Sequence, residues 1–450
     1  MPANPPVPTP LAYLDAVVAE QKAGVPRGIT AVCSAHPIVL DAAIAHAVDG
    51  DEPVLIEATS NQVDQYGGYT GMRPAGFRDL VHELGARRGL PGARIILGGD
   101  HLGPNRWTES PADRAMDEAE ALVVEYVQAG FTKIHLDCSF PCRGDAEILD
   151  DATVAARAAR LAAAADRTAS RCGTAAQVRY VIGTEVPAPG GARHTIDALQ
   201  PTPLASARAS LAANRAALAA ADVEHLWPQV TALVVQPGVE FDHMHVVEYD
   251  PTRTTELRTA LDDQPNMIFE AHSTDYQSAG ALGELVAHHW AILKVGPELT
   301  FALREGLFAL AAIESELITL EAQSALRSVV DRRMEVDPRY WASYYEAGAG
   351  LVERHYSYSD RIRYYWSDQD VVAAQNRLLA NLSRTGIPAP LLSQYLPDQY
   401  RRVRDGRLDA DPRELLVDRV RDVLRRYDRA CRRGQYRDAA MTPVCAPGRS

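Results

Sequence analysis

An acid and an imidazole stand side by side at Asp100-His101, within the polar stretch of residues 98–105. The stretch follows residues 94–97, a run that is typical of a buried parallel strand. Two glycines open the stretch, and we expect them to let the backbone turn sharply at the end of the strand. In a parallel α/β fold, ligands bind at this edge of the sheet. We therefore interpret Asp100 as a catalytic acid or base, with Asp137 as a second candidate, and His101 as a metal ligand.

Ionisable side chains follow most of the other apolar runs in the same way. Neutral imidazoles and a carboxylate can hold a divalent metal ion and leave one position open for substrate. The sequence therefore predicts further metal ligands at His243, His272 and Glu185. His135 and Glu270 lie inside apolar runs, where each is either a satisfied interior group or part of the site.

A second set of polar side chains at the same edge is suited to bind substrate: Asn61, Gln62, Ser273, Thr274, Lys294 and Arg361. Backbone amides around residues 273–274 and after Gly296, together with Lys294, can cradle a phosphate, as the late loops of barrels often do. The sequence contains neither a Walker A motif nor a GxGxxG at a strand–helix turn. We therefore expect no nucleotide cofactor and no kinase of the common classes.

Eight apolar runs alternate with helical patterns and position these residues. The runs are residues 28–33, 53–58, 94–97, 132–137, 178–183, 232–235, 267–270 and 291–295. The alternation predicts a (β/α)8 barrel that occupies residues 1–320, with a short disordered tail at the N-terminus. A doubly wound sheet is the alternative, but it would not need eight strands that each carry polar residues at one end.

The pattern changes after residue 320, where helical periodicity continues without further strand signals. We expect residues 321–450 to form a helical C-terminal extension that packs on the barrel. One loop in this region, residues 356–366, is dense in aromatic residues and arginines.

The composition restricts the classes of partner. The chain has 450 residues, 46% of them hydrophobic, and a formal net charge of -13, which argues against nucleic acid and anionic membranes as main partners. No apolar run reaches the ~20 residues that span a bilayer, and the proline-rich N-terminus does not resemble a signal peptide. Six scattered cysteines are typical of reduced thiols. We expect a cytoplasmic protein, and the sequence leaves a homo-oligomer open.

Several long motifs resemble those of one family. They include residues 57–63, 67–72, 98–105, 133–137, 183–187, 236–243, 270–277, 294–297 and 359–366. The sequence resembles the second, Z-type subunit of class II D-tagatose-1,6-bisphosphate aldolase from about residue 27 to residue 432. Asp64 and Cys138 are small departures, since the family pattern has asparagine and alanine there.

The resemblance implies a barrel similar to the class II aldolases, in which an Asp-His pair ends the third strand and histidines end the sixth and seventh. It also implies a non-catalytic subunit that supports the activity and stability of a separate catalytic aldolase. The pathway would be breakdown of galactitol, N-acetylgalactosamine or tagatose 6-phosphate. Other members of the family resemble ketohexose 4-epimerases, which are metal enzymes.

Two functional hypotheses therefore stay open. The first is a partner subunit of a class II tagatose-bisphosphate aldolase. The second is a ketohexose 4-epimerase that acts on its own, with zinc or manganese, on a small sugar or sugar phosphate. The intact rim of acids and histidines favours the second hypothesis, because a scaffold does not require it.

Overall fold

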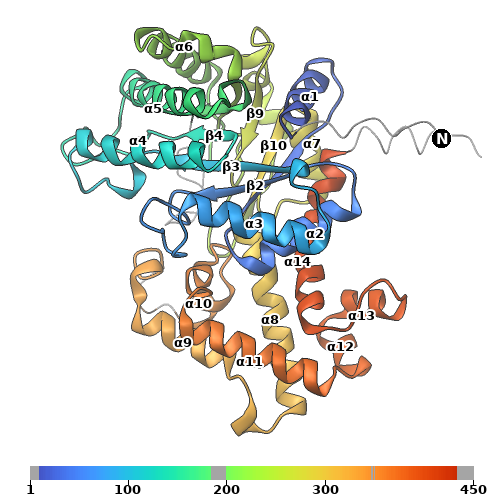
Figure 1. Cartoon of the computed structure of the whole chain (residues 1–450). Helices are drawn as coiled ribbons and strands as arrows, with labels where there is room; N and C mark the ends of the chain where they lie inside the picture. The colour runs from blue at the N-terminus through green and yellow to red at the C-terminus, as the bar shows by residue number, and fades with distance from the viewer. Residues whose placement is uncertain (1–9, 184–198, 346–347, 349, 433–450) are drawn as a thin grey trace, which may run out of the picture.

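Eight parallel strands close into a barrel in the computed structural model, which describes residues 10–183, 199–345, 348 and 350–432 (Figure 1). Around the barrel the strands are ordered β1-β10-β9-β6-β5-β4-β3-β2. Their bounds are β1 (Ile29–Cys33), β2 (Val54–Thr59), β3 (Ile95–Leu102), β4 (Lys133–Leu136), β5 (Arg179–Gly183), β6 (Val230–Val234), β9 (Ile268–Ala271) and β10 (Trp290–Val295). The predicted (β/α)8 barrel is confirmed, and a doubly wound open sheet is excluded.

Helix α5 begins and ends at capping residues. Asp150 accepts a hydrogen bond from the Thr153 N–H at the start of α5, and Gly173 ends that helix at a φ of 71°. The helices of this part of the chain are α1 (Pro10–Lys22), α2 (Pro37–Asp49), α3 (Pro74–Arg88), α4 (Ala112–Gln128), α5 (Asp151–Cys172), α6 (Leu204–Ala220), α7 (Ala279–Ala287) and α8 (Pro297–Leu317).

The two ends of the barrel interior differ in chemistry. Tyr13, Leu14 and Val17 of α1 join one apolar cluster with strand residues such as Ile96 and Val181, so this helix closes the end where the strands begin. Apolar burial stabilises that end. Charged and imidazole side chains fill the interior nearer the other end, where the strands finish.

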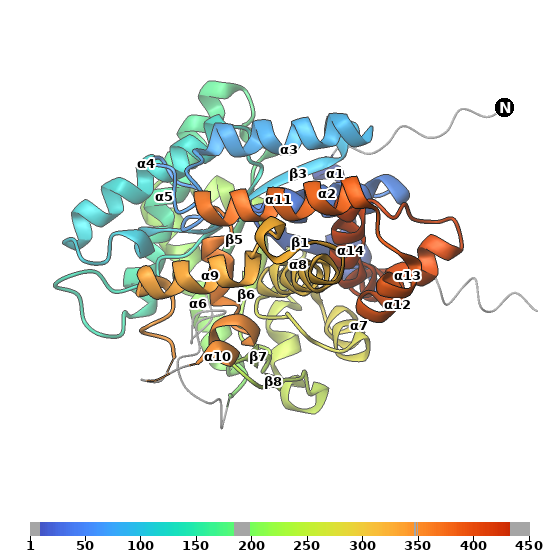
Figure 2. The same cartoon turned by 90° about the horizontal axis from the view of Figure 1, so that it is seen from below.

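Except for α14, the remaining helices of the described part of the chain lie across the end where the strands finish (Figures 1 and 2). The remaining helices are α9 (Leu326–Val336), α10 (Leu351–Tyr356), α11 (Gln369–Thr385), α12 (Ala389–Tyr395), α13 (Pro397–Arg404) and α14 (Pro412–Cys431). In the described part of the chain, no helix combines the length and the apolar character needed to cross a membrane.

Helix α14 belongs to the wall of the barrel rather than to its cover. It packs against α2, α7 and β1, and the Gly28 N–H donates to the Cys431 carbonyl at 2.9 Å. Helix α8 instead runs away from the barrel and contacts α11 and α12 (Figure 1). A chain cut at residue 320 would therefore lose a helix that covers β1, and the division at residue 320 stays a proposal.

Candidate active site

Asp100 and His101 are neighbours in the sequence, yet both side chains reach the same cluster, because the backbone of β3 changes direction at His101. The pairing of β3 with β4 shifts register between Gly99 and Leu102, and His101 adopts a φ of 50°. A non-glycine residue in this left-handed region is held there by its surroundings, often at a functional site. The turn therefore lies at His101 and not at the two glycines before it.

The two glycines do not form the predicted turn; they are needed because neighbouring groups pack closely against them. Both lie inside β3, and a Cβ atom on Gly98 would stand 2.6 Å from Glu57 Oε1. A Cβ atom on Gly99 would stand 2.6 Å from Leu102 Cδ1 and 2.8 Å from Tyr126 Cδ1. Gly98 thus makes room for a buried carboxylate inside the barrel, and Gly99 allows close packing outside it.

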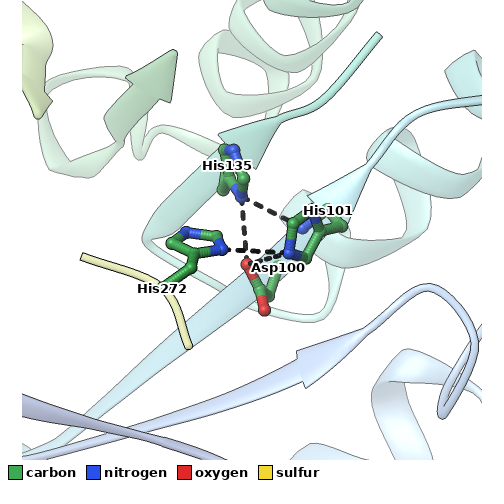
Figure 3. A group of neighbouring side chains, drawn as sticks. All are labelled: Asp100, His101, His135 and His272. Atoms are coloured by element: carbon green, nitrogen blue, oxygen red, sulfur yellow. Dashed lines mark hydrogen bonds and ion pairs between the residues drawn. The ribbon is translucent and has the colours of Figure 1, made fainter. Parts of the chain in front are cut away.

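Four side chains from three strands meet at the carboxyl end of the barrel (Figure 3). Ligand atoms of Asp100, His101, His135 and His272 all lie within 4.8 Å of one another. His101 Nε2 is 3.1 Å from His272 Nδ1, and His135 Nδ1 is 3.0 Å from Asp100 Oδ1. At zinc–nitrogen bonds of roughly 2.0–2.1 Å, nitrogens this far apart subtend about 100° at the metal, close to a tetrahedral angle. The four residues form a possible metal-binding site.

The hydrogen bonds of the two facing rings explain why a cation fits between them. His101 Nδ1 is 2.7 Å from Asp137 Oδ2, and His272 Nε2 is 3.0 Å from Glu270 Oε1. If each ring donates to its carboxylate, both facing nitrogens present lone pairs when the rings are neutral. One proton or one metal ion must therefore lie at this contact.

The titration of these rings favours a proton on His101 when no metal is bound. Burial lowers the pKa of His272 to about 3, so this ring is neutral. Burial also disfavours the charged form of His101, but the Asp100 and Asp137 carboxylates outweigh it and raise the pKa of His101. A metal ion would displace that proton.

Buried charges next to the four residues also match a divalent cation. Lys133 Nζ lies 2.6 Å from Glu57 Oε1 and 2.6 Å from Glu270 Oε2, and Lys294 Nζ lies 2.8 Å from Asp100 Oδ1. Lys294 also pairs with Glu57. Among the described residues, four buried carboxylates face two ammonium groups here: Glu57, Asp100, Asp137 and Glu270 with Lys133 and Lys294. A formal charge of -2 remains, and a buried uncompensated charge is costly, so a doubly charged ion fits the donor set.

The predicted metal ligands only partly come together. His101 and His272 are adjacent, but His243 is not in this group: its Nε2–H donates to the Tyr344 carbonyl at 2.7 Å and its Nδ1 lies 3.0 Å from Ser359 Oγ. Glu185 lies outside the described residues. His243 sits beside a two-residue strand, β7 (Glu240–Phe241), which pairs with β8 (Val246–Val247) and directs this segment towards the C-terminal helices.

His135 takes a place in the group that the sequence prediction left open. Its Nε2–H donates to the Gly183 carbonyl at 3.1 Å, and its Nδ1 accepts the His101 backbone N–H at 3.2 Å. The sequence of β4 already indicated this role for His135. Lys133 and His135 are two residues apart, so both side chains lie on the same face of the strand, the face that points into the barrel. Two interior polar residues at this spacing indicate a polar layer inside the barrel.

Asp137 holds His101 instead of facing the open space. Its side chain is 1% exposed, and besides His101 it accepts hydrogen bonds from the N–H and hydroxyl of Ser139. Burial disfavours its charged form, but the hydrogen bond and charge of His101 lower the pKa of Asp137 well below its usual range. Burial alone would raise the pKa of Asp100. The nearby His101 and Lys294 outweigh burial and lower the pKa of this carboxyl.

A cavity of about 660 Å³ opens above the four residues, between the barrel and the C-terminal helices. Five of the six predicted substrate-binding residues line it: Asn61, Gln62, Ser273, Lys294 and Arg361. The sixth, Thr274, is not among the lining residues; its hydroxyl donates to the Lys294 carbonyl at 2.5 Å and faces the Tyr427 hydroxyl at 3.1 Å.

The turns between α9 and α11 supply the aromatic and cationic wall of this cavity. Tyr344, Arg363, Tyr364 and Trp366 line it, and the Arg361 guanidinium lies 3.2 Å from the centre of the Tyr344 ring. Apolar ring faces combined with a few placed polar groups are typical of small-molecule sites. The loop that is dense in arginines and aromatic residues is therefore part of the candidate site.

The fold and the site define a (β/α)8 barrel protein with a possible metal centre at the carboxyl ends of its strands. Residues 14–432 match a family model described as D-tagatose-1,6-bisphosphate aldolase subunit GatZ/KbaZ-like. The chain belongs to that family, and the resemblance expected from the sequence is confirmed.

The chain is also similar to solved structures. A probable tagatose 6 phosphate kinase from Sinorhizobium meliloti 1021 is 45% identical, with a TM-score of 0.83, over 90% of this chain and 100% of that chain. The YdjI aldolase from Escherichia coli K12 is 10% identical, with a TM-score of 0.40, over 83% of this chain and 96% of that chain. The fructose-bisphosphate aldolase from Campylobacter jejuni is 14% identical, with a TM-score of 0.42, over 83% and 91%.

Proposed function

We propose that this chain is the partner subunit of a class II tagatose-bisphosphate aldolase. It binds the catalytic aldolase subunit and is required for its full activity and stability, in the breakdown of galactitol, N-acetylgalactosamine or tagatose 6-phosphate. The observation that carries this proposal is membership of the GatZ/KbaZ-like family over residues 14–432.

Co-expression with a class II tagatose-bisphosphate aldolase tests this proposal. The two chains should co-purify, and an excess of this chain should lengthen the thermal half-life of the aldolase, because a partner that binds only the folded form stabilises it. An aldolase whose half-life and rate do not respond to this chain would contradict the subunit role.

A second candidate function, a metal-dependent ketohexose 4-epimerase, is favoured by one specific observation. Three of the four possible metal ligands, Asp100, His101 and His272, line a cavity large enough for a sugar, and a scaffold would need neither the ligands nor the cavity. A zinc or manganese ion held by His101 and His272 would stabilise negative charge on a carbonyl oxygen of the sugar.

The chain's own residues supply the other requirements of epimerisation at carbon 4. Asp100 is ionised beside Lys294 and lines the cavity, so it can take the 4-hydroxyl proton as the C3–C4 bond breaks and return it when that bond re-forms on the other face of the aldehyde. Asp137 fixes the orientation of His101, and Asn61 and Arg361 are placed to orient the sugar. The kinase name of the related Sinorhizobium structure is not carried over, because this sequence has no Walker A or GxGxxG motif.

Sugar interconversion by the purified chain tests the second function. With zinc or manganese, it should convert fructose and tagatose into one another without a partner, and Asp100→Asn should lower turnover by about 10²–10⁴. At saturating metal the variant should keep nearly all of its metal, since His101 and His272 remain to bind it. A metal-loaded wild-type chain that converts neither the free nor the phosphorylated sugars would leave only the subunit role.

A further inference from the structure

Several groups near the predicted phosphate cradle are bonded to the chain itself. In (β/α)8 barrels, the loops after the seventh and eighth strands and a helix N-terminus often form the phosphate site. Here these loops follow β9 and β10, and the second leads into α8. The Ser273 hydroxyl donates to Glu240 Oε2 at 3.1 Å, and the Lys294 ammonium is paired with Asp100.

A carboxylate of the chain occupies the N-terminus of α8. Asp275 Oδ1 accepts the Gly296 N–H at 2.9 Å and the Glu298 N–H at 2.8 Å. Pro297, between them, has no N–H to offer, so the carboxylate takes the backbone donors that an anionic ligand would use there. Asp275 is 3% exposed and, like Gly296, lines the cavity.

A second carboxylate, paired with an arginine, lies behind the first. Glu298 Oε2 accepts the Tyr276 N–H at 2.7 Å, and this side chain also pairs with Arg426. A phosphate group placed beside Asp275 and Glu298 would find its donors taken and would be repelled. A hydroxyl group carries no charge and meets neither obstacle.

We propose that Asp275 is a specificity-determining residue: its carboxylate occupies the phosphate position of the barrel, so the α8 end of the cavity accepts a sugar hydroxyl and excludes a phosphate group. The proposal rests on the second candidate function, in that the cavity binds a ketose. The ketose bound there would carry no phosphate group on the end that lies next to α8.

Removal of the carboxylate should create a phosphate site. Asp275→Ala frees two backbone donors at the positive end of a helix, and should bind inorganic phosphate at least about ten-fold more tightly than the wild-type chain. Titration calorimetry at constant ionic strength and pH 8 measures this, because burial raises the pKa of Asp275 to about 7 and the carboxylate is ionised at that pH. Asp150→Ala is the matched control: it removes the N-cap carboxylate of α5, away from the cavity, and should bind phosphate as wild type does.

Equal phosphate affinity in the wild-type chain and Asp275→Ala would overturn the proposal. If the alanine variant does not fold, Asp275→Asn decides, since it keeps the acceptor oxygen and removes the charge. This variant should bind phosphate about three-fold more tightly than wild type, and no gain would overturn the proposal. In parallel, free fructose is titrated into the metal-loaded wild-type chain. Failure to bind fructose refutes the second candidate function. The phosphate titration decides the role of Asp275 independently of that result.

Discussion

Substitution of Lys133 tests whether the stability of the barrel depends on a balance of buried charges. Its ammonium lies 2.6 Å from a carboxylate oxygen of Glu57 and 2.6 Å from one of Glu270, and the three side chains are at most 1% exposed. Lys133→Met removes that charge while it keeps much of the volume. Breaking a buried pair by removal of one partner typically costs about 3–5 kcal/mol, because the other charge stays buried without compensation.

The expected loss can be converted to a shift in melting temperature. An unfolding entropy of about 2.1 cal/mol/K per residue gives roughly 0.9 kcal/mol/K for 450 residues, so Lys133→Met should lower Tm by about 3–5 °C. Differential scanning calorimetry of the metal-free chain measures this. Lys22→Met is the control: Lys22 donates one hydrogen bond, from Nζ to the Leu261 carbonyl at 2.8 Å, so this substitution should cost no more than about 1.5 kcal/mol.

Added metal sharpens the same test. A divalent cation offsets part of the negative charge that Lys133→Met leaves behind, so zinc should raise the Tm of this variant by more than it raises that of the wild-type chain. If Lys133→Met is as stable as the wild-type chain without metal, the account of buried charge balance is wrong.

Three further predictions concern the metal ligands. Asp137→Asn should weaken metal binding by about 10–100-fold in competition with a chelator, as removal of a carboxylate behind a ligating histidine commonly does; an unchanged affinity would show that this carboxylate does not act through His101. His135→Ala should reduce the bound metal measured by elemental analysis, whereas His243→Ala should leave it unchanged because His243 contacts the C-terminal helices; the reverse result would restore His243 as a ligand. Metal affinity should fall as pH is lowered, because the raised pKa of His101 lets protons compete with the metal at higher pH than at an ordinary histidine; calorimetric titration between pH 6 and pH 8 should show this fall, and an affinity independent of pH would contradict it.

The barrel could be predicted because each strand carries its own signal. Buried parallel strands are continuous apolar runs, and eight of them alternate with helical periodicity. The third strand was predicted too short, since residues 98 and 99 are glycines and glycine usually interrupts a strand. In the structure β3 continues through them to Leu102, because Gly98 makes room for Glu57 and the pairing with β2 extends to Asp100.

The exact membership of the site could not be predicted, because it depends on contacts between distant strands. His135 has the same sequence context as a packed interior histidine, and only the approach of Asp100 from β3 and of His272 from β9 makes it part of the group. His243 follows the sixth strand as a ligand would, but it lies in the turn of a short hairpin, and its ring is bonded to Tyr344 and Ser359. The position of α14 beside β1 could not be predicted either. An amphipathic pattern shows that one face of a helix is buried, but it does not show which part of the protein covers that face.

The most direct test of the metal site is anomalous X-ray diffraction from crystals of the wild-type chain grown with zinc. We expect one strong peak bonded to both His101 Nε2 and His272 Nδ1, at roughly 2.0–2.1 Å from each, with Asp100 beside it. The peak should be absent from crystals of His101→Ala. A wild-type structure at saturating zinc with no peak at these two nitrogens, or with zinc bound only elsewhere, would contradict the assignment of this barrel end as a metal centre.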